Sequence, residues 1–209
     1  MKQEDIERIV LPLMEAHRCH TVVLYGSHAR GDATESSDID VLFVREDGPA
    51  ARDARVVDGV YVDAFIYPEA ALNKVEPSLL RLLGGVVLRE REGFGTALLR
   101  RIGELEARGP ALLPDDERRM LVVWSHKMLD RFRGQPGVEA NYRRRSLLVQ
   151  ALEDYFTLRN GWFRGPKVAF AWLLENDVAS YRAFERAAEP GATDEALADL
   201  VRAVYGPPG

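Results

Sequence analysis

The hydrophobic positions in the first half of the chain change their spacing several times. In residues 3–18 the apolar side chains recur at helical spacing, which predicts an amphipathic helix. Its expected buried face consists of Ile6, Ile9, Val10, Leu13 and Met14. Four later runs have the length and the β-branched content of strands, at 21–25, 38–44, 55–57 and 60–66. Asp58-Gly59 separates the last two runs, and this dipeptide predicts a β-hairpin.

Further along the chain most of the pattern is helical, and after residue 114 all of it is. Residues 68–75 and 95–107 have helical spacing, and the short run 86–89 is typical of an edge strand. The segment 108–114 contains a glycine and two prolines and is the expected linker. Two helices are expected after it, at 115–133 and 138–158, and two or three shorter ones follow near 166–175, 178–188 and 193–204. We therefore predict an α+β protein: a small mixed β-sheet with flanking helices in residues 1–108, followed by a C-terminal helical bundle in residues 115–209.

Composition and charge exclude several classes of protein. The formal net charge is −5 at pH 7, which argues against a protein that coats nucleic acid. Cys19 is the only cysteine, so an intramolecular disulfide and a cysteine-rich zinc site are excluded. The first ten residues are polar, and no run approaches the roughly 18–20 apolar residues that cross a bilayer. We expect a cytoplasmic protein with no membrane contact and no nucleic-acid partner.

The segment 26–40 carries the candidate chemistry, in the order Gly-Ser, ten residues, Asp-x-Asp. Side chains alternate along a strand, so Asp38 and Asp40 are expected on one face and Ile39 on the other. Two neighbouring carboxylates on a buried strand repel each other and lose hydration, and such an arrangement persists when a cation neutralises it. Hard divalent ions with oxygen ligands suit this site, Mg²⁺ first and Mn²⁺ second.

A third carboxylate would allow the site to hold two metal ions. Asp63 is the candidate, because it lies in the middle of the apolar run 60–66, where an acidic residue is otherwise unfavourable. The strand that carries Asp63 is expected to lie beside the strand of Asp38 and Asp40. The alternative left open is that Asp63 is a surface acid on an edge strand.

The Gly-Ser turn has the properties of a phosphate-binding loop. Gly26 lacks a side chain, so a phosphate can come close to the backbone. Ser27 offers a hydroxyl and is expected to be the N-cap of a short helix that ends at Arg30. The free backbone N–H groups at the start of this helix favour anions. Arg30 would add a charge-assisted contact, or else form a surface salt bridge. A phosphate-binding turn beside a carboxylate pair indicates phosphoryl or nucleotidyl transfer.

These residues resemble the nucleotidyltransferase superfamily that includes DNA polymerase beta and kanamycin nucleotidyltransferase. The resemblance spans residues 20–66 and rests on Gly-Ser, ten residues, Asp-x-Asp and the later strand Asp. It implies that Asp38, Asp40 and Asp63 are the catalytic residues and bind two Mg²⁺ ions. It also implies that Gly26 and Ser27 hold the triphosphate of an NTP, with ATP the expected donor.

The helical half resembles the C-terminal domains of small bacterial and antibiotic-modifying members, chiefly through the basic and aromatic segment 159–167. Lys167 in that segment would reach the triphosphate, or else be a surface lysine at a helix start. In such relatives two chains can share a site, so a homodimer is compatible with the resemblance. A general base would come from the helical half, where Glu139, Glu153 and Asp154 are the alternatives.

Three functions remain open at this point. The first is transfer of a nucleoside monophosphate to a hydroxyl of a small, aminoglycoside-like molecule, with release of pyrophosphate. The second is modification of a protein, as in antitoxin-like minimal nucleotidyltransferases. The third is a nucleotide-binding regulator without activity, whose expected mark, the loss of a metal-binding acid, is absent from this sequence.

Overall fold

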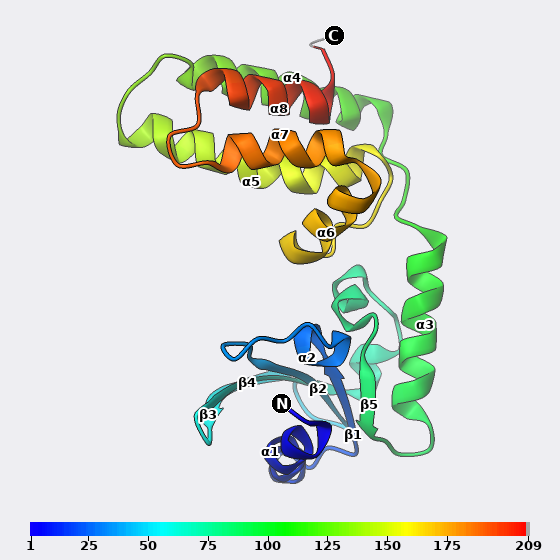
Figure 1. The fold of residues 1–209 in the computed structure, drawn as a ribbon. Helices are drawn as coiled ribbons and strands as arrows, with labels where there is room; N and C mark the ends of the chain where they lie inside the picture. Colours follow the sequence, from blue (N-terminus) through cyan, green and yellow to red (C-terminus); the bar gives the residue numbers. More distant parts are fainter. Residues whose placement is uncertain (208–209) are drawn as a thin grey trace. The chain divides into compact units, whose positions relative to one another are not determined.

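The structure is a computed structural model that describes residues 1–207. It divides into two compact units, Met1–Arg108 and Gly109–Gly209 (Figure 1). The first unit contains a five-stranded mixed β-sheet with helices against it, and the second unit is helical. The α+β prediction is therefore confirmed. Among residues 1–207 no helix is long and apolar enough to span a membrane.

The sheet of the first unit has the strand order β3-β4-β2-β1-β5. Its strands are β1 (Thr21–Tyr25), β2 (Ile39–Arg45), β3 (Ala51–Val57), β4 (Val60–Pro68) and β5 (Val86–Arg89). Strands β2 and β4 are parallel, and the other neighbouring strands are antiparallel. The hairpin at Asp58-Gly59 joins β3 to β4, as predicted, but β3 begins four residues earlier than the expected run at residue 55.

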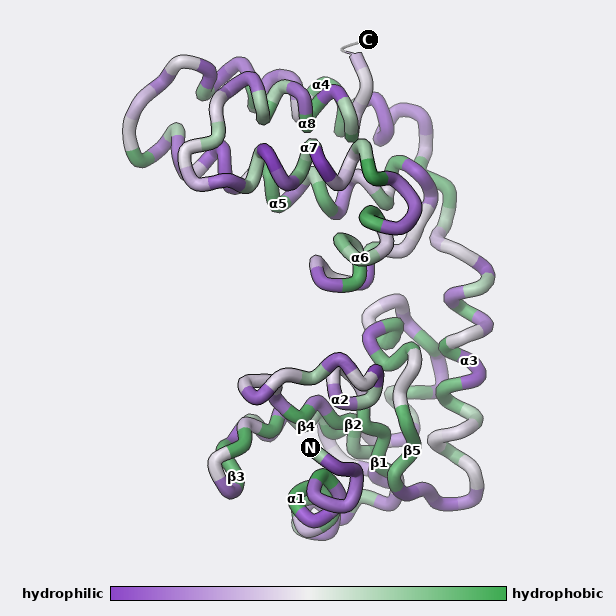
Figure 2. Tube along the Cα trace, in the orientation of Figure 1, coloured by the Kyte–Doolittle hydropathy of each residue, from purple (hydrophilic) through white to green (hydrophobic). Residues whose placement is uncertain are grey.

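One face of the sheet is covered by helix α1 (Gln3–Ala16). The five apolar residues predicted for its buried face are all buried, and they pack against alternate residues of the strands, such as Ile39, Val41 and Phe43. Figure 2 shows that the central strands are more hydrophobic than α1, which is buried along one side only. The alternation of side chains therefore leaves the even-numbered residues of β2, including Asp40, for the opposite face.

The opposite face is contacted by η1 (Glu69–Leu72), η2 (Pro77–Leu82) and helix α3 (Phe94–Arg108). The sequence predicted one helix over 68–75, whereas the structure contains only the short 3₁₀ turn η1 there. Pro77 gives the reason, since a residue before proline avoids helical dihedrals, and Glu76 is extended at ψ 155°. The turn η2 was not predicted, although it contributes the buried Leu79, Leu80 and Leu82.

The second unit contains helices α4 (Asp115–Phe132), α5 (Val138–Leu158), α6 (Pro166–Asn176), α7 (Val178–Ala188) and α8 (Asp194–Tyr205). All five agree with the predicted helices to within one or two residues. Their shared core includes Phe132, Leu147, Leu173 and Phe184. Side-chain caps support two of the helix starts, with Asp177 accepting from Ser180 N at α7 and Thr193 accepting from Ala196 N at α8.

A carboxylate is buried in this second core. Asp154 of α5 is 3% exposed and accepts hydrogen bonds from the Tyr205 hydroxyl at 2.6 Å and from Gln150 Nε2 at 2.9 Å. Burial, together with the hydrogen bond to Asp154, raises the pKa of Tyr205, so the hydroxyl remains a donor. Tyr205 therefore attaches the end of α8 to α5 through a hydrogen bond that is buried away from water.

We expect Tyr205→Phe to lower the free energy of unfolding by about 1–3 kcal/mol, because a buried carboxylate loses one of its two donors. The measurement is urea unfolding followed by circular dichroism. Tyr142→Phe, at a residue that is 72% exposed, is the matched control and should change the unfolding free energy by less than about 0.5 kcal/mol. Equal unfolding curves for the two variants would contradict the prediction.

Candidate active site

Three polar side chains form a row across the sheet on the face away from α1. Tyr25 of β1 is opposite Asp40 of β2, and Asp40 is opposite Asp63 of β4 in the parallel register. Neighbouring strands lie about 4.8 Å apart, so the two carboxylates emerge side by side from one face. Asp38 precedes β2 and is exposed, one residue outside the strand that the sequence predicted to begin there.

The charges of the three acids act on Asp40. Its pKa is raised from 3.8 to about 6, first by burial and then by the charges of Asp38 and Asp63. Arg30 and Arg81 act in the opposite direction and favour the charged form. Asp40 is half-buried, so water screens this repulsion only in part. The three predicted acids are therefore electrostatically coupled, and the coupling disfavours the charged form of Asp40.

Gly26 provides the close approach on which the predicted phosphate loop depends. It has φ +72°, a conformation that favours glycine. A Cβ at this position would overlap Oδ2 of Asp40 and lie 3.0 Å from its Cγ. The absence of a side chain therefore leaves the space immediately beside the Asp40 carboxylate.

The short helix α2 (Gly26–Arg30) differs from the prediction in its first turn. Its N-cap is Tyr25 rather than Ser27, because the helix already begins at Gly26. With only five residues it has little macrodipole, so the expected anion site at its start loses that support. Ser27 uses its backbone oxygen to accept from Asp32 N at 3.1 Å, and no described residue bonds its hydroxyl. Arg30 lies 3.5 Å from Asp32, in the salt bridge left open as its alternative role.

Asp63 has a partner that the sequence analysis missed. Arg52 of β3 donates from Nε to Oδ1 and from Nη2 to Oδ2 of Asp63, both at 2.7 Å. The hairpin register explains the contact, because Arg52 is opposite Phe65 and so lies on the same face as Asp63. The signal was present in Asp58-Gly59, which sets this register, but the predicted strand began at residue 55 and stopped short of Arg52.

Arg81 and Tyr25 also border the acids and were not predicted. The Arg81 guanidinium lies 4.3 Å from the centre of the Phe65 ring and donates to Ser78 O and to the Tyr67 hydroxyl. Burial raises the pKa of Tyr25 to about 12, although Arg81 lowers it, so its hydroxyl stays protonated. No periodicity or spacing in the sequence marks Arg81, because η2 reaches the site through tertiary packing on β1 and through the contacts of Arg81 with Phe65 and Tyr67.

The acids fit a hard divalent ion in their chemistry. All three offer carboxylate oxygens, and the pKa of Asp40 is raised by burial and then by the charges of Asp38 and Asp63, both of which a bound cation would offset. In residues 1–207, however, no three His, Cys, Asp or Glu side chains are placed as a ready metal-binding group. At Asp63 both carboxylate oxygens accept from the Arg52 guanidinium.

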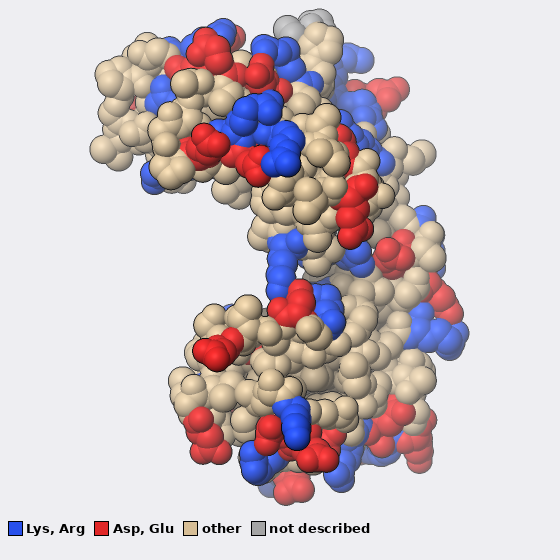
Figure 3. All heavy atoms as spheres, viewed as in Figure 1, with Lys and Arg blue, Asp and Glu red and all other residues tan. Residues whose placement is uncertain are grey.

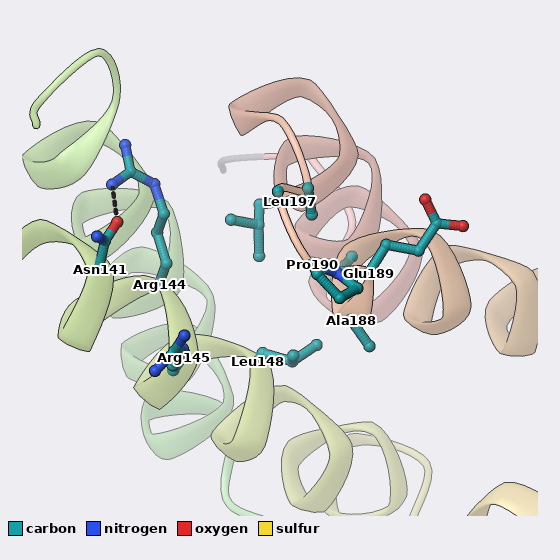
Figure 4. Close-up of a pocket in the computed structure, with 11 residues that line it drawn as sticks. Asn141, Arg144, Arg145, Leu148, Ala188, Glu189, Pro190 and Leu197 are labelled. Carbon is teal, nitrogen blue, oxygen red and sulfur yellow. Dashed lines mark hydrogen bonds between the residues drawn. The ribbon is translucent and has the colours of Figure 1, made fainter.

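The candidate residues of the second unit mostly have structural contacts. Lys167 is the second residue of α6, Arg143 is paired with Glu139 at 2.6 Å, and Asp154 is the buried acid described above. A cavity of about 420 Å³ is lined by residues that include Arg144 and Arg145. Figure 4 shows these two side chains with others that line it.

Arg144 borders this cavity without a free donor face. It bonds Asp194, Asn141 and the backbone oxygens of Phe132 and Gln135. Arg159, from the basic and aromatic segment, donates to the oxygens of Ala203 and Val204 at the end of α8. Both arginines therefore stabilise helix ends within the bundle.

Part of this chain is similar to known nucleotidyltransferase domains. Residues 15–100 match the family model described as a nucleotidyltransferase domain. A protein of Methanocaldococcus jannaschii named "Putative protein adenylyltransferase" is 28% identical over 113 residues, which cover 47% of this chain and 77% of that protein. The crystal structure of a nucleotidyltransferase-like protein from Exiguobacterium sibiricum 255-15 aligns with a TM-score of 0.42 and 15% identity, over 96% of this chain and 77% of that chain. Residues 15–100 of this chain are therefore similar to nucleotidyltransferase domains, in agreement with the resemblance that the sequence carries.

Proposed function

We propose that the protein transfers a nucleoside monophosphate from an NTP, with ATP the expected donor, to an acceptor hydroxyl. The observation that carries the proposal is the coupled row of acids beside Gly26. An acceptor oxygen bonds the α-phosphorus, the bond from the α-phosphorus to the bridging oxygen breaks, the hydroxyl proton is released and pyrophosphate leaves. The acids would carry the reaction, and Gly26 and Ser27 would hold the triphosphate.

Asp38, Asp40 and Asp63 are the residues that would hold Mg²⁺. Bound there, the ion would compensate the charge that develops on the phosphate oxygens. The side chains of this chain contribute the rest: Gly26 allows close approach to Asp40, and the Ser27 hydroxyl is available as a donor. Arg30 lies close enough to favour the charged form of Asp40, and we propose that it also attracts the triphosphate.

A small cationic molecule is the acceptor class that we favour. In the second unit a pocket of about 690 Å³ is lined by Met120, Leu121, Trp124, Glu117, Glu153 and Asp154. Apolar walls with a few acidic groups suit a hydroxyl compound that also carries amino groups, since Trp124 can face a cation and the exposed carboxylates of Glu117 and Glu153 attract it. Figure 3 shows basic and acidic groups intermixed on the visible surface of both units, which is unlike the basic face of a nucleic-acid-binding protein.

Protein modification is the second candidate, and the name of the relative from Methanocaldococcus jannaschii favours it. The similarity covers 113 residues, which is 47% of this chain. The donor half of the reaction is the same in both candidates. The two differ only in whether the label from ATP ends on a small molecule or on a polypeptide.

The test is incubation of the full chain and Mg²⁺ with ATP labelled at the α-phosphate. One set of reactions contains a panel of amino-sugar alcohols, and a second contains protein extract. Label on a small product supports the favoured acceptor class, and label on a polypeptide supports protein modification. Chelation of Mg²⁺ by EDTA should reduce either transfer to background.

Asp38→Asn should reduce transfer by about 10²-fold or more, because an amide cannot replace a charged oxygen ligand. Asp47→Asn, at an exposed loop residue outside the site, is the matched control and should keep full activity. Transfer that persists in EDTA and in Asp38→Asn would disprove the proposed function.

A further inference from the structure

The ion pair between Arg52 and Asp63 joins two residues in very different surroundings. The Asp63 side chain is 11% exposed, whereas that of Arg52 is 58% exposed. The guanidinium thus reaches in from the surface and covers a nearly buried carboxylate. A buried carboxylate requires a cationic or hydrogen-bonding partner, and in this structure Arg52 supplies both contacts.

Three arginines lie around the acids, and they differ in what they bond. Arg30 is paired with Asp32, and Arg81 donates to Ser78 O and to the Tyr67 hydroxyl. Among the residues that the structure describes, Arg52 is the arginine that bonds one of the three acids directly. It therefore occupies the position in which a cation would neutralise Asp63.

The position of Arg52 in the fold allows its guanidinium to move away from the Asp63 carboxylate. Strand β3 is at the edge of the sheet, and most of its residues are exposed. The guanidinium also lies 5.0 Å from the centre of the Phe65 ring, which gives it a second contact beside the carboxylate. Because the Arg52 side chain is 58% exposed, its movement away from Asp63 would uncover no hydrophobic core.

We propose that Arg52 and a divalent cation compete for Asp63, so that Arg52 sets the metal affinity of the site. The inference rests on the proposed function, because it assumes that the three acids bind metal. A metal ion ligated at about 2.1 Å by an oxygen of Asp63 would lie beside the guanidinium and repel it. Both oxygens already accept from Arg52, so binding of the ion at Asp63 requires at least one of these hydrogen bonds to break.

The experiment is titration of the full chain with Mn²⁺ alone, followed by the EPR signal of free Mn²⁺. Arg52→Ala should bind Mn²⁺ about 5- to 50-fold more tightly than the wild type, since the competing cation is gone. Arg52→Lys keeps the charge but loses the two-pronged geometry, and its affinity should lie between the two. Circular dichroism of each variant verifies that it is folded.

Arg55→Ala is the matched control. Arg55 lies on the same strand, is 51% exposed and bonds both oxygens of Asp53, which also contacts His17 at the end of α1. The Arg55→Ala substitution removes the same charge from the other face of the sheet, so its Mn²⁺ affinity should stay within about twofold of the wild type. Asp63→Asn separates competition from a general field effect: adding Arg52→Ala to Asp63→Asn should leave the affinity unchanged.

The outcomes separate the two proposals. If the wild type and Arg52→Ala bind Mn²⁺ with equal affinity, Arg52 does not compete and the inference fails while the metal site stands. If Arg52→Ala gains as much affinity in the Asp63→Asn background as alone, the effect is one of net charge and the inference again fails. If neither protein binds Mn²⁺, the inference fails together with the proposed function.

Discussion

Asp40→Asn should reduce nucleotidyl transfer by at least about 10²- to 10³-fold and, at the same time, make the metal-free protein more stable. The loss of activity follows from removal of the charged oxygen that we propose as a metal ligand, next to Asp63 in the sheet. The gain in stability follows from the raised pKa of Asp40, whose charged form is disfavoured by burial and by Asp38 and Asp63. Because water reaches this half-buried group, we expect a gain on the order of only 1 kcal/mol at pH 8.

The pH dependence of this gain provides the control. The folded-state pKa of Asp40 is about 6, above the ordinary value of 3.8, so the folded protein binds more protons between these values. The contribution of Asp40 to stability therefore falls as the pH rises from about 4 to about 6. Urea unfolding in EDTA should show Asp40→Asn and wild type alike below this range and different above it. A variant less stable than the wild type at pH 8 would contradict the prediction.

Gly26→Ala should lower both stability and activity. A left-handed residue with a side chain costs about 1–2 kcal/mol, and the new Cβ would overlap the Asp40 carboxylate and add about 1–3 kcal/mol. Displacement of Asp40 should also reduce transfer by about 10²-fold, since a misplaced catalytic group loses its orientation. The measurements are urea unfolding and the labelled-ATP assay.

Gly31→Ala is the matched control for this variant. Gly31 has φ +81° at the end of α2, and a Cβ there would meet nothing within 4 Å. Gly31→Ala shares the backbone strain of Gly26→Ala but not the overlap with Asp40. It should therefore lower the free energy of unfolding by about 1–2 kcal/mol and keep most of the activity. Equal losses of activity in the two variants would show that the space beside Asp40 has no role.

The local elements of this protein could largely be predicted because their patterns are local. Helix α1 and its buried face follow from a 3.6-residue period, and the hairpin follows from Asp58-Gly59. The predictions were wrong where packing or chain stiffness competed with the pattern. Pro77 prevents a continuous helix after β4, and the early start of α2 makes Tyr25, not Ser27, the N-cap.

The sequence by itself determined which residues are candidates for the chemistry. It also determined that the acidic side chains of the strands lie on the opposite face of the sheet from the core side chains. Alternation separates Asp40 from Ile39 and Val41, and the Gly-Ser spacing indicates a nucleotidyltransferase. Only the tertiary structure decided that Asp40 is opposite Asp63 and that Arg52 covers Asp63. The physical reason is that β2 and β4 pair directly in the sheet although β3 lies between them in the sequence, and such non-local pairing leaves no period in the chain. The charges that Asp40 experiences therefore come from contacts that no sequence pattern specifies.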